Sequence, residues 1–429
     1  MDVEAVDAVE LICQGKLKLR MKVLLFAEAV TLAHVARPIA LARALDPARY
    51  EVMLACDPRY AEFANGGPWQ RADLHSIPSR QFNRALARGA PLYDLATLDD
   101  YAKQDAALIA AFHPDLVVGD FRLSLSVSAR VAKVPYLTIA NAYWSPYSRA
   151  GFPLPVLPIT RLLPLPLAEA LFATFRPIAF AMHCRPMNQL RARHGLPSLG
   201  YDLRRVYTDA DHHLVPDLAQ LYPLDCPPGQ HSYIGPLSWS PSLPLPAWWD
   251  EPVPDGQATV YATLGSSGPV ALLSMLLQAL DGLPLRVLAS TAGAPAPPQL
   301  PGNARVAPYL PGDTAAARSQ LVICNGGSLT TQQALAVGVP VLGLASNMDQ
   351  FLNMAPIEAA GAGLTLRADR VNPAAIRAAC QHLLASAAAS AAARRLQALL
   401  EQQPSVGETF DRVVAKLVSV DSGERLQSS

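Results

Sequence analysis

The sequence predicts an α/β fold made of two doubly wound parallel sheets, and three observations support this prediction. Short apolar runs rich in β-branched residues alternate with helical patterns in both halves of the chain, as in parallel βαβ units. A proline-rich stretch, residues 236–254, separates the two series. The chain also has 429 residues, and a single core rarely grows beyond about 250–300 residues. Two domains therefore account for the length better than one.

Composition favours a chain that folds around apolar cores and carries no strong electric field. Hydrophobic residues make up 51% and charged residues 16%, which is too apolar for a disordered chain. The 35 basic and 35 acidic residues cancel, so no nucleic-acid partner is expected. The cysteines form no C-x-x-C pair, and we interpret them as reduced packing residues of a cytoplasmic protein that binds no metal. They are Cys13, Cys56, Cys184, Cys226, Cys324 and Cys380.

The domain boundaries follow from these patterns. Residues 1–20 begin with acids and lack an apolar core, so they form an N-terminal extension rather than a signal peptide. No run reaches the roughly 20 apolar residues of a membrane span. The expected organisation is an extension (1–20), a first domain (21–235), a proline-rich linker (236–257), a second domain (258–402), and a C-terminal helix with a tail (403–429).

The first domain opens with a βαβ pattern. Its expected strands are residues 23–27, 50–56, 115–120 and 134–139, and a helix follows the first strand through Leu45. Ligands of doubly wound sheets bind beyond the carboxyl ends of the strands, where His34 and Asp120 both fall. A helix start disfavours the imidazolium and keeps the His34 ring neutral, as a base requires. Taken alone, His34 also fits a solvent-facing residue and Asp120 a loop cap.

Residues 144–224 are irregular, with proline-punctuated apolar segments and a helix expected over 168–182. One interpretation is a helical insertion packed on the sheet. The other is the apolar wall of a pocket for an acceptor, and composition does not separate the two. Basic residues in this segment also allow a weak contact with a membrane surface. They are Arg161, Arg176, Arg185 and Arg191.

The second domain repeats the pattern and carries two glycine turns. Its expected strands are residues 258–264, 285–290, 304–309, 321–324 and 339–344. The turn Gly265-Ser266-Ser267-Gly268 precedes a helix over 270–280, and Gly326-Gly327 precedes a helix over 330–337. Glycines let a ligand approach the backbone, and the free N–H groups of a helix start favour phosphate. Gly-Gly pairs also serve tight packing, so spacing alone leaves both interpretations open. Near the C-terminus, Phe410, Val413, Val414, Leu417 and Val418 fall at helical spacing and are expected to dock on the body of the protein.

The order of residues from Tyr309 to Asn353 resembles the donor-binding signature of family 1 nucleotide-sugar glycosyltransferases. That signature runs aromatic-x-Pro, His-Gly-Gly, Ser/Thr, Glu, Gly-Val-Pro and Asp-Gln. Asn325 stands where the family usually has a phosphate-binding His, and Gln333 where it has a ribose-binding Glu. The loop of residues 31–38, TLAHVARP, resembles the loop of the family's general base, with Ala33 in place of a usual Gly. The remaining matches are Tyr309, Pro311, Gly326, Gly327, Thr330, Gly338, Val339, Pro340, Asp349, Gln350 and Asn353.

The resemblance implies a bacterial-type enzyme of the GT-B fold, with two Rossmann-like domains facing across a cleft. The first domain would bind the acceptor, the second the donor, and the last helix would cross back to the first domain. His34 would be the general base of an inverting, metal-independent transfer, and Asp120 would hold its ring. Asp349 and Gln350 would bind sugar hydroxyls, and Tyr309 would lie against the nucleobase. The implied donor-site residues are Gly265, Ser266, Ser267, Tyr309, Leu310, Asn325, Gly326, Gly327, Ser328, Thr330, Gln333, Asp349 and Gln350.

The implied donor is a UDP- or dTDP-linked sugar, with glucose and rhamnose as examples, and no other cofactor is expected. The implied acceptor is a small hydrophobic molecule with a hydroxyl, such as a phenolic or flavonoid, a polyketide or a lipid. The amide of Gln333 would grip ribose less strongly than a carboxylate and so tolerate the deoxyribose of dTDP. Two alternatives remain: a nucleotide-sugar 2-epimerase of the same fold, and a nucleotide-binding module without catalysis. The sequence fits either a monomer or a homodimer.

Overall fold

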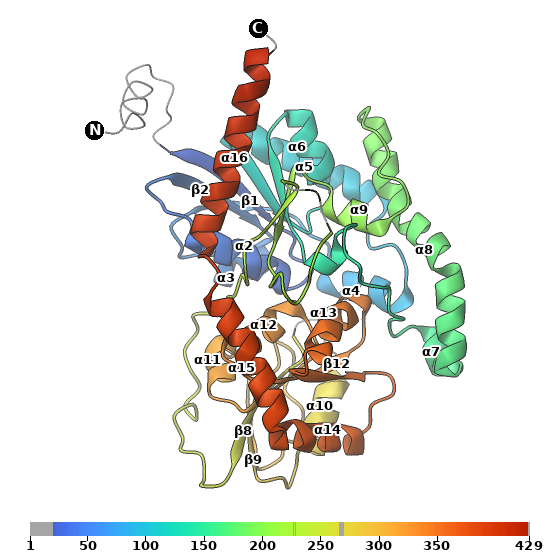
Figure 1. The fold of residues 1–429 in the computed structure, drawn as a ribbon, viewed down its shortest axis with the longest axis vertical. Coiled ribbons are helices and arrows are strands. Elements are labelled where there is room, and N and C mark those ends of the chain that lie inside the picture. The colour runs from blue at the N-terminus through green and yellow to red at the C-terminus, as the bar shows by residue number, and fades with distance from the viewer. Residues whose placement is uncertain (1–19, 226, 228, 266–269, 428–429) are drawn as a thin grey trace.

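A computed structural model describes residues 20–225, 227, 229–265 and 270–427, and it contains two parallel sheets, one above the other in Figure 1. The first sheet has the order β3-β2-β1-β4-β5-β6-β7, and all its pairings are parallel. Sheet order changes direction between β1 and β4, which makes their carboxyl ends the crevice where ligands of such sheets bind. The strands are β1 (Met21–Ala27), β2 (Tyr50–Cys56), β3 (Gln70–Asp73), β4 (Leu116–Asp120), β5 (Tyr136–Ile139), β6 (His212–Val215) and β7 (His231–Tyr233).

Helices cover both faces of this sheet, and the central strands are therefore buried on both sides. Val23, Leu24, Leu25 and Phe26 of β1 have no exposed surface, which explains the continuous apolar run in the sequence. The helices of this half are α2 (Ala33–Ala44), α3 (Ala61–Ala64), α4 (Ser79–Arg88), α5 (Leu95–Phe112), α6 (Leu125–Ala132), α7 (Pro158–Leu162), α8 (Leu165–Arg193) and α9 (Leu203–Thr208), with 3₁₀ turns η1 (Pro58–Tyr60) and η2 (Ala142–Trp144).

The second sheet is built in the same way, with the order β10-β9-β8-β11-β12-β13 and parallel pairing throughout. Its order changes direction between β8 and β11, so Gly265 and Gly326 both follow the strands at that point. The strands are β8 (Ala258–Thr263), β9 (Leu285–Ser290), β10 (Ala304–Ala307), β11 (Leu321–Cys324), β12 (Val341–Ala345) and β13 (Gly363–Arg367). The helices are α10 (Val270–Ala279), α11 (Gly312–Ala317), α12 (Ser328–Ala336), α13 (Met348–Ala359), α14 (Pro373–Ala385) and α15 (Ala387–Glu401).

Helix α8 differs from both its expected length and its expected packing. It continues to Arg193, and its C-terminal part packs into a core cluster through Cys184, Met187 and Leu190. Of its most apolar 18-residue window, however, only 6% is buried. The interpretation of this segment as packed on the sheet is therefore wrong for most of the helix. Within the described ranges, α8 is the one helix long and apolar enough, by length and composition alone, to cross a membrane.

Two further segments connect the halves. Helix α16 (Val406–Gln427) places Phe410 and Val413 in the same core cluster as the residues of β1, and Asp411 accepts a hydrogen bond from Tyr50 Oη at 2.5 Å. In the proline-rich stretch, Trp239 and Trp249 are buried and anchor it to the body, while residues 250–254 are exposed. The predicted N-terminal extension up to residue 19, Cys13, Cys226, Ser266 and Ser267 lie outside the described residues.

Candidate active site

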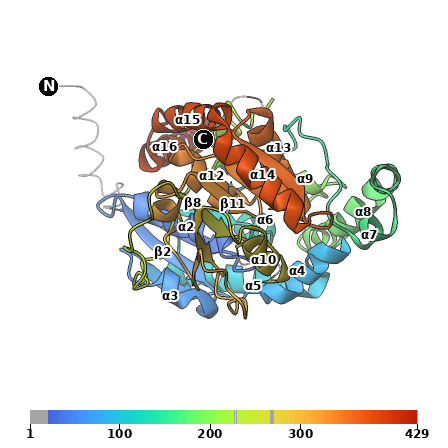
Figure 2. The same ribbon diagram turned by 90° about the horizontal axis from the view of Figure 1, so that it is seen from below.

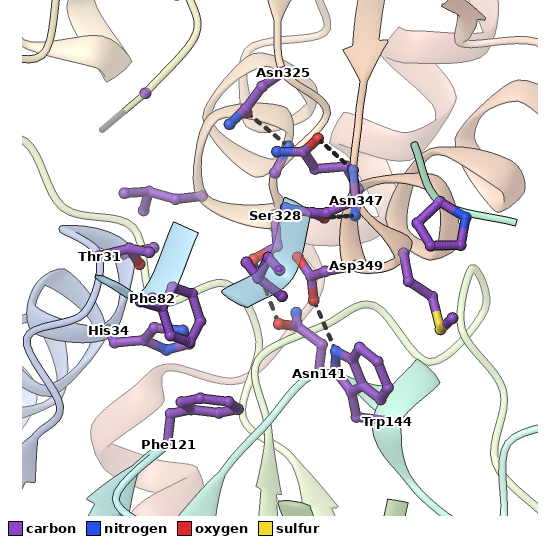
Figure 3. Close-up of a pocket in the computed structure, with 18 of the residues that line it drawn as sticks. Thr31, His34, Phe82, Phe121, Asn141, Trp144, Asn325, Ser328, Asn347 and Asp349 are labelled. Atoms are coloured by element: carbon purple, nitrogen blue, oxygen red, sulfur yellow. Dashed lines mark hydrogen bonds between the residues drawn. The ribbon is translucent and has the colours of Figure 1, made fainter. Parts of the chain in front are cut away.

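A cavity of about 660 Å³ lies between the carboxyl ends of the two sheets and takes its lining from both halves of the chain. Figure 3 shows His34, Phe82 and Phe121 on one side of it, and Ser328 and Asp349 on the side formed by the second half. Of the described residues predicted as catalytic or donor-site residues, all but two line this cavity. The exceptions are Asp120, which is hydrogen-bonded to His34, and Gly326.

His34 and Asp120 form a hydrogen-bonded pair at the edge of the cavity. His34 Nδ1 lies 2.7 Å from Asp120 Oδ1, the carboxylate is fully buried, and the imidazole is 18% exposed. The pair forms because His34 lies in the first turn of α2, which follows β1 after the loop of residues 28–32, while Asp120 ends the neighbouring strand β4. A carboxylate at Nδ1 fixes the proton on that nitrogen, so Nε2 is the ring atom left to act as a base.

Phe121 packs against this histidine. Its ring stacks on the imidazole at a centroid distance of 4.8 Å and an interplanar angle of 15°. Its backbone φ is 58°, in the left-handed region that a bulky residue rarely adopts. Backbone strain of this kind clusters at functional sites, and here it turns the chain sharply after Asp120 so that the phenyl ring covers one face of the base. The sequence gives no signal for this conformation.

Arg37 is a third member of the group and was not predicted from the sequence. Its Nε donates to Asp120 Oδ2 and its Nη2 to Asp120 Oδ1, both at 2.7 Å. Burial lowers the pKa of Arg37, but the charge and hydrogen bonds of Asp120 outweigh this effect and hold the pKa above its ordinary value. The available signal was its position three residues after His34, which puts both on one face of α2.

A buried polar network continues from Arg37 into the second half of the chain. Arg37 Nη1 donates to Asn141 Oδ1 at 2.8 Å, and Asn141 Nδ2 donates to Asp217 Oδ1 at 2.8 Å. Gln332 Nε2 of α12 donates to the same Asp217 oxygen at 3.1 Å, and Ser328 Oγ lies 3.5 Å from Asn141 Oδ1. Burial raises the pKa of Asp217 to about 6. Polar groups of the two halves of the chain are thus parts of one network.

The glycine turn before α12 and the first turn of that helix face the cavity. Gly327, Ser328 and Thr330 line the cavity, and the Gly327 N–H donates to Asn325 Oδ1 at 3.0 Å. Gly326 has φ 82°, and a Cβ there would lie 2.8 Å from Met354 Cγ. Gly326 is therefore required for backbone conformation and tight packing, while the N-terminus of α12 provides oriented N–H groups.

Three of the predicted donor-site side chains are also engaged with protein atoms. Gln333 Nε2 donates to the Trp239 carbonyl at 2.8 Å, which ties α12 to the proline-rich stretch. Gln350 Oε1 accepts from the Ser346 N–H at 2.7 Å and from the Asn347 N–H at 3.3 Å, the second bond being part of the capping box of α13. Asp349 Oδ1 accepts from Trp144 Nε1 at 2.8 Å across the cavity, so Trp144 is a further residue of the site that was not predicted from the sequence.

The remaining predicted residues lie at the same edge of the second sheet. Gly265 follows β8 with φ 62°, and Leu310 is buried beside the cavity. Tyr309 is half-buried and packs edge-on against Phe63 of the first half, with ring centroids 5.3 Å apart. Opposite these groups, the wall of the first half is apolar, with aromatic residues from α4, from the turn after β4 and from α8. They include Phe82, Phe121, Phe172, Phe175 and Phe180.

Comparisons with known proteins agree with this architecture. Residues 278–417 match the family described as "Erythromycin biosynthesis protein CIII-like, C-terminal domain". A "PGL/p-HBAD biosynthesis glycosyltransferase" of Mycobacterium tuberculosis (strain H37Ra) is 50% identical over 377 residues, which are 88% of each chain. A "PGL/p-HBAD biosynthesis rhamnosyltransferase" of Mycobacterium bovis (strain BCG / Pasteur) is also 50% identical, over 88% of this chain and 84% of that relative.

Solved structures share the fold at lower identity. "Spinosyn Rhamnosyltransferase SpnG complexed with spinosyn aglycone" superposes with a TM-score of 0.67 at 20% identity, covering 91% of this chain and 99% of that one. The same enzyme complexed with thymidine diphosphate gives a TM-score of 0.64 at 20% identity, covering 92% and 99%. Identity at this level supports the shared two-domain fold alone.

Proposed function

The chain belongs to the family 1 glycosyltransferases of the GT-B fold, and from this premise we propose an inverting transfer from a nucleoside-diphosphate sugar to a hydroxyl of a small hydrophobic acceptor. The observation that carries this proposal is the His34–Asp120 pair, which lies at the edge of the cavity that also receives the N-terminus of α12. A base and an anion-binding helix start on opposite sides of one cavity are the two elements that such a transfer needs.

The donor side would stabilise the leaving group. As the bond between the sugar C1 and the phosphate oxygen breaks, the sugar becomes oxocarbenium-like and negative charge grows on the diphosphate. Ser328, Leu329 and Thr330 lie at the start of α12, where backbone N–H groups have no acceptor within the helix. These groups, with the hydroxyls of Ser328 and Thr330, would donate to the diphosphate in an arrangement set before the reaction.

The acceptor side would supply the base. The acceptor hydroxyl forms a bond to the sugar C1 from the face opposite the leaving group, so the configuration inverts, and its proton passes to His34 Nε2. Asp120 would hold the Nδ1 proton and stabilise the imidazolium, as the acid does in a serine-protease triad. Because Arg37 donates twice to Asp120, it would fix that carboxylate in place.

For the donor we propose a UDP- or dTDP-linked sugar, with Asp349 and Gln350 against the sugar hydroxyls. The names of the relatives support a rhamnosyl donor, and the complex of SpnG with thymidine diphosphate supports dTDP. The amide of Gln333 donates to the Trp239 carbonyl, and a carboxylate there would face that carbonyl without a proton to share. Our proposal is that the amide of Gln333 tolerates the deoxyribose of dTDP. Comparing the affinities for UDP- and dTDP-sugars in wild type and Gln333→Glu tests it, and an unchanged preference between the two nucleotides would contradict it.

For the acceptor we propose a phenolic, polyketide or lipid-like molecule. We also propose that the transfer uses no metal and no cofactor besides the nucleotide sugar. The aromatic wall of the cavity supports an apolar body, and the SpnG complex holds an aglycone. Among the described residues that line the cavity, Asp349 is the one carboxylate. A 2-epimerase is expected to have a cleft rich in carboxylates, so this lining favours transfer over epimerisation.

The test uses UDP-glucose and dTDP-rhamnose with a panel of phenols, comparing wild type with His34→Ala. Transfer that is lost in His34→Ala while donor binding remains would support the proposal. Sugar product formed without an acceptor would point to an epimerase instead. Donor binding with no turnover in the wild type, on any acceptor of the panel, would point to a nucleotide-binding module.

A further inference from the structure

Helix α8 exposes an apolar stripe to solvent. Leu167, Phe175, Ile178 and Met182 are 49%, 57%, 60% and 55% exposed and fall at positions i, i+8, i+11 and i+15, which lie on one side of a helix. Leu162 of α7 is 80% exposed. In Figures 1 and 2, α7 and α8 project from the body of the molecule. Large apolar side chains gathered on one exposed helix face mark an interaction surface.

This stripe is continuous with the wall of the cavity. Phe175 belongs to both, because it is more than half exposed and also lines the cavity, and Leu171 lines it one turn earlier. The neighbouring face of α8, with Phe172, Ala179 and Phe180, completes the wall. An apolar chain attached to a bound acceptor could therefore leave the cavity along α8 without crossing a polar surface.

Basic residues flank the same opening. Helix α4 carries Arg80, Arg84 and Arg88 at four-residue spacing, all exposed, and contains no acidic residue. Its C-terminal Gly89 carbonyl lies 3.3 Å from His183 Nε2 of α8, so the two helices meet at the mouth of the cavity. Residues 158–193 add the exposed Arg161 and Arg185 and contain a single acid, Glu169.

The combination of an apolar stripe with one sign of charge identifies the partner. Arginines beside exposed apolar side chains fit a bilayer surface that carries anionic headgroups. A second copy of this chain would bring like charges together, which disfavours a symmetric contact. A membrane-spanning role is also disfavoured, because the face of α8 next to the stripe builds the cavity wall and the helix contains Pro177 and Pro186.

We propose that the surface formed by the α8 stripe and the α4 arginines docks on an anionic lipid bilayer. The apolar side chains enter the boundary of the acyl chains, and the arginines contact lipid phosphates. This deepens the proposed function, on which it rests in one respect: the acceptor is taken from the membrane with its alkyl chain lying along α8.

Vesicle flotation tests the docking without donor or acceptor, so its outcome is independent of catalysis. The full chain is mixed with vesicles of phosphatidylcholine alone or with one third phosphatidylglycerol, at low and at high salt. We expect binding to the anionic vesicles that weakens with salt. Ile178→Ser/Met182→Ser and Arg80→Gln/Arg84→Gln, whose side chains lie outside the cavity, should each weaken binding by about tenfold or more.

Matched controls place the same changes elsewhere. Leu300→Ser removes a residue that is 47% exposed, and Arg394→Gln/Arg395→Gln removes two exposed arginines of α15, on the opposite side of Figure 1 from α8. These controls should bind vesicles as the wild type does, and transfer to a soluble phenol should be equal in all variants. Absence of wild-type binding to anionic vesicles would overturn the proposal. It would also fall if the wild type is a dimer that Ile178→Ser/Met182→Ser makes monomeric.

Discussion

Replacing Asp120 with Asn tests whether the buried carboxylate orients the His34 ring and stabilises its protonated form. Asp120 accepts three hydrogen bonds, one from His34 Nδ1 and two from Arg37, each at 2.7 Å. An amide has one oxygen and one NH₂ group, so it cannot accept from all three donors. If its NH₂ faces His34, the imidazole must carry its proton on Nε2 and cannot act as a base. If its NH₂ faces Arg37, His34 keeps its proton on Nδ1, but the negative charge that stabilises the imidazolium is lost.

The magnitude follows from the position of Arg37. Its Nη2 lies 2.9 Å from His34 Nδ1, so an imidazolium without the carboxylate would face a guanidinium directly. Two unit charges about 4 Å apart at an effective dielectric constant of about 20 repel by about 4 kcal/mol, or roughly a thousandfold in rate. General-base catalysis is itself worth about 10²–10⁴-fold. We expect kcat of Asp120→Asn to fall by about 10²–10⁴.

The assay is release of nucleoside diphosphate in the presence of acceptor, with His34→Ala as the reference. A buried Arg37 without its partner costs about 3–5 kcal/mol of stability, so circular dichroism and donor binding must first establish that the variant is folded. Donor affinity should be unchanged within about threefold, because Asp120 does not line the cavity. An Asp120→Asn enzyme that keeps more than one tenth of wild-type kcat, while His34→Ala is inactive, would refute the reasoning.

The remaining predictions concern stability and donor binding. Burial raises the pKa of Asp217 to about 6 and lowers that of His213 to about 4. Between pH 7 and pH 4.5 the folded state therefore gains stability from Asp217, because it binds the proton more tightly than the unfolded chain, and loses stability at His213. We therefore expect the free energy of unfolding, measured in urea, to change differently in the variants between pH 7 and pH 4.5. Relative to wild type, it should fall by about 2 kcal/mol in Asp217→Asn and rise by about 2 kcal/mol in His213→Gln. The same dependence of this free energy on pH in all three proteins would contradict the prediction. Arg122 is fully buried between two carboxylates, so Arg122→Met should lower the free energy of unfolding by about 3–5 kcal/mol, and a loss under 1 kcal/mol would contradict it. Trp144→Phe removes the hydrogen bond to Asp349, so donor KM should rise by about tenfold with kcat less affected, and an unchanged KM would contradict it.

Strands with apolar β-branched runs were predictable because burial on both faces leaves a continuous signal. β2, β9 and β11 begin and end at the expected residues. β3 and β6 were missed, because β3 is a polar edge strand and β6 begins with His212 and His213. Those histidines are buried because they bond to backbone carbonyls, of Gly229 at 3.0 Å and of Ala140 at 2.7 Å. Local polarity does not reveal such tertiary partners.

The site was predictable where a residue type follows a strand end, and not where it depends on a distant partner. His34 and Asp120 come to one place because β1 and β4 are neighbours at the point where the sheet order reverses. Asn141 and Asp217 follow β5 and β6 at the same edge, but nothing in their local sequence indicates that they bond to each other. The exposure of α8 was equally hidden, since the sequence does not show how far a helix extends beyond the sheet.

Asn141 links the proposed base to the proposed donor site, and its chemistry permits no simple replacement. Its oxygen accepts from Arg37 Nη1 and lies 3.5 Å from Ser328 Oγ, while its NH₂ donates to Asp217. A carboxylate there would face Asp217, and an apolar side chain would leave buried donors of Arg37 unpaired. Because Arg37 also holds Asp120, a shift of α12 on donor binding would be transmitted through Asn141 toward His34. We therefore expect the buried network to couple occupancy of the proposed donor site to the placement of the proposed base.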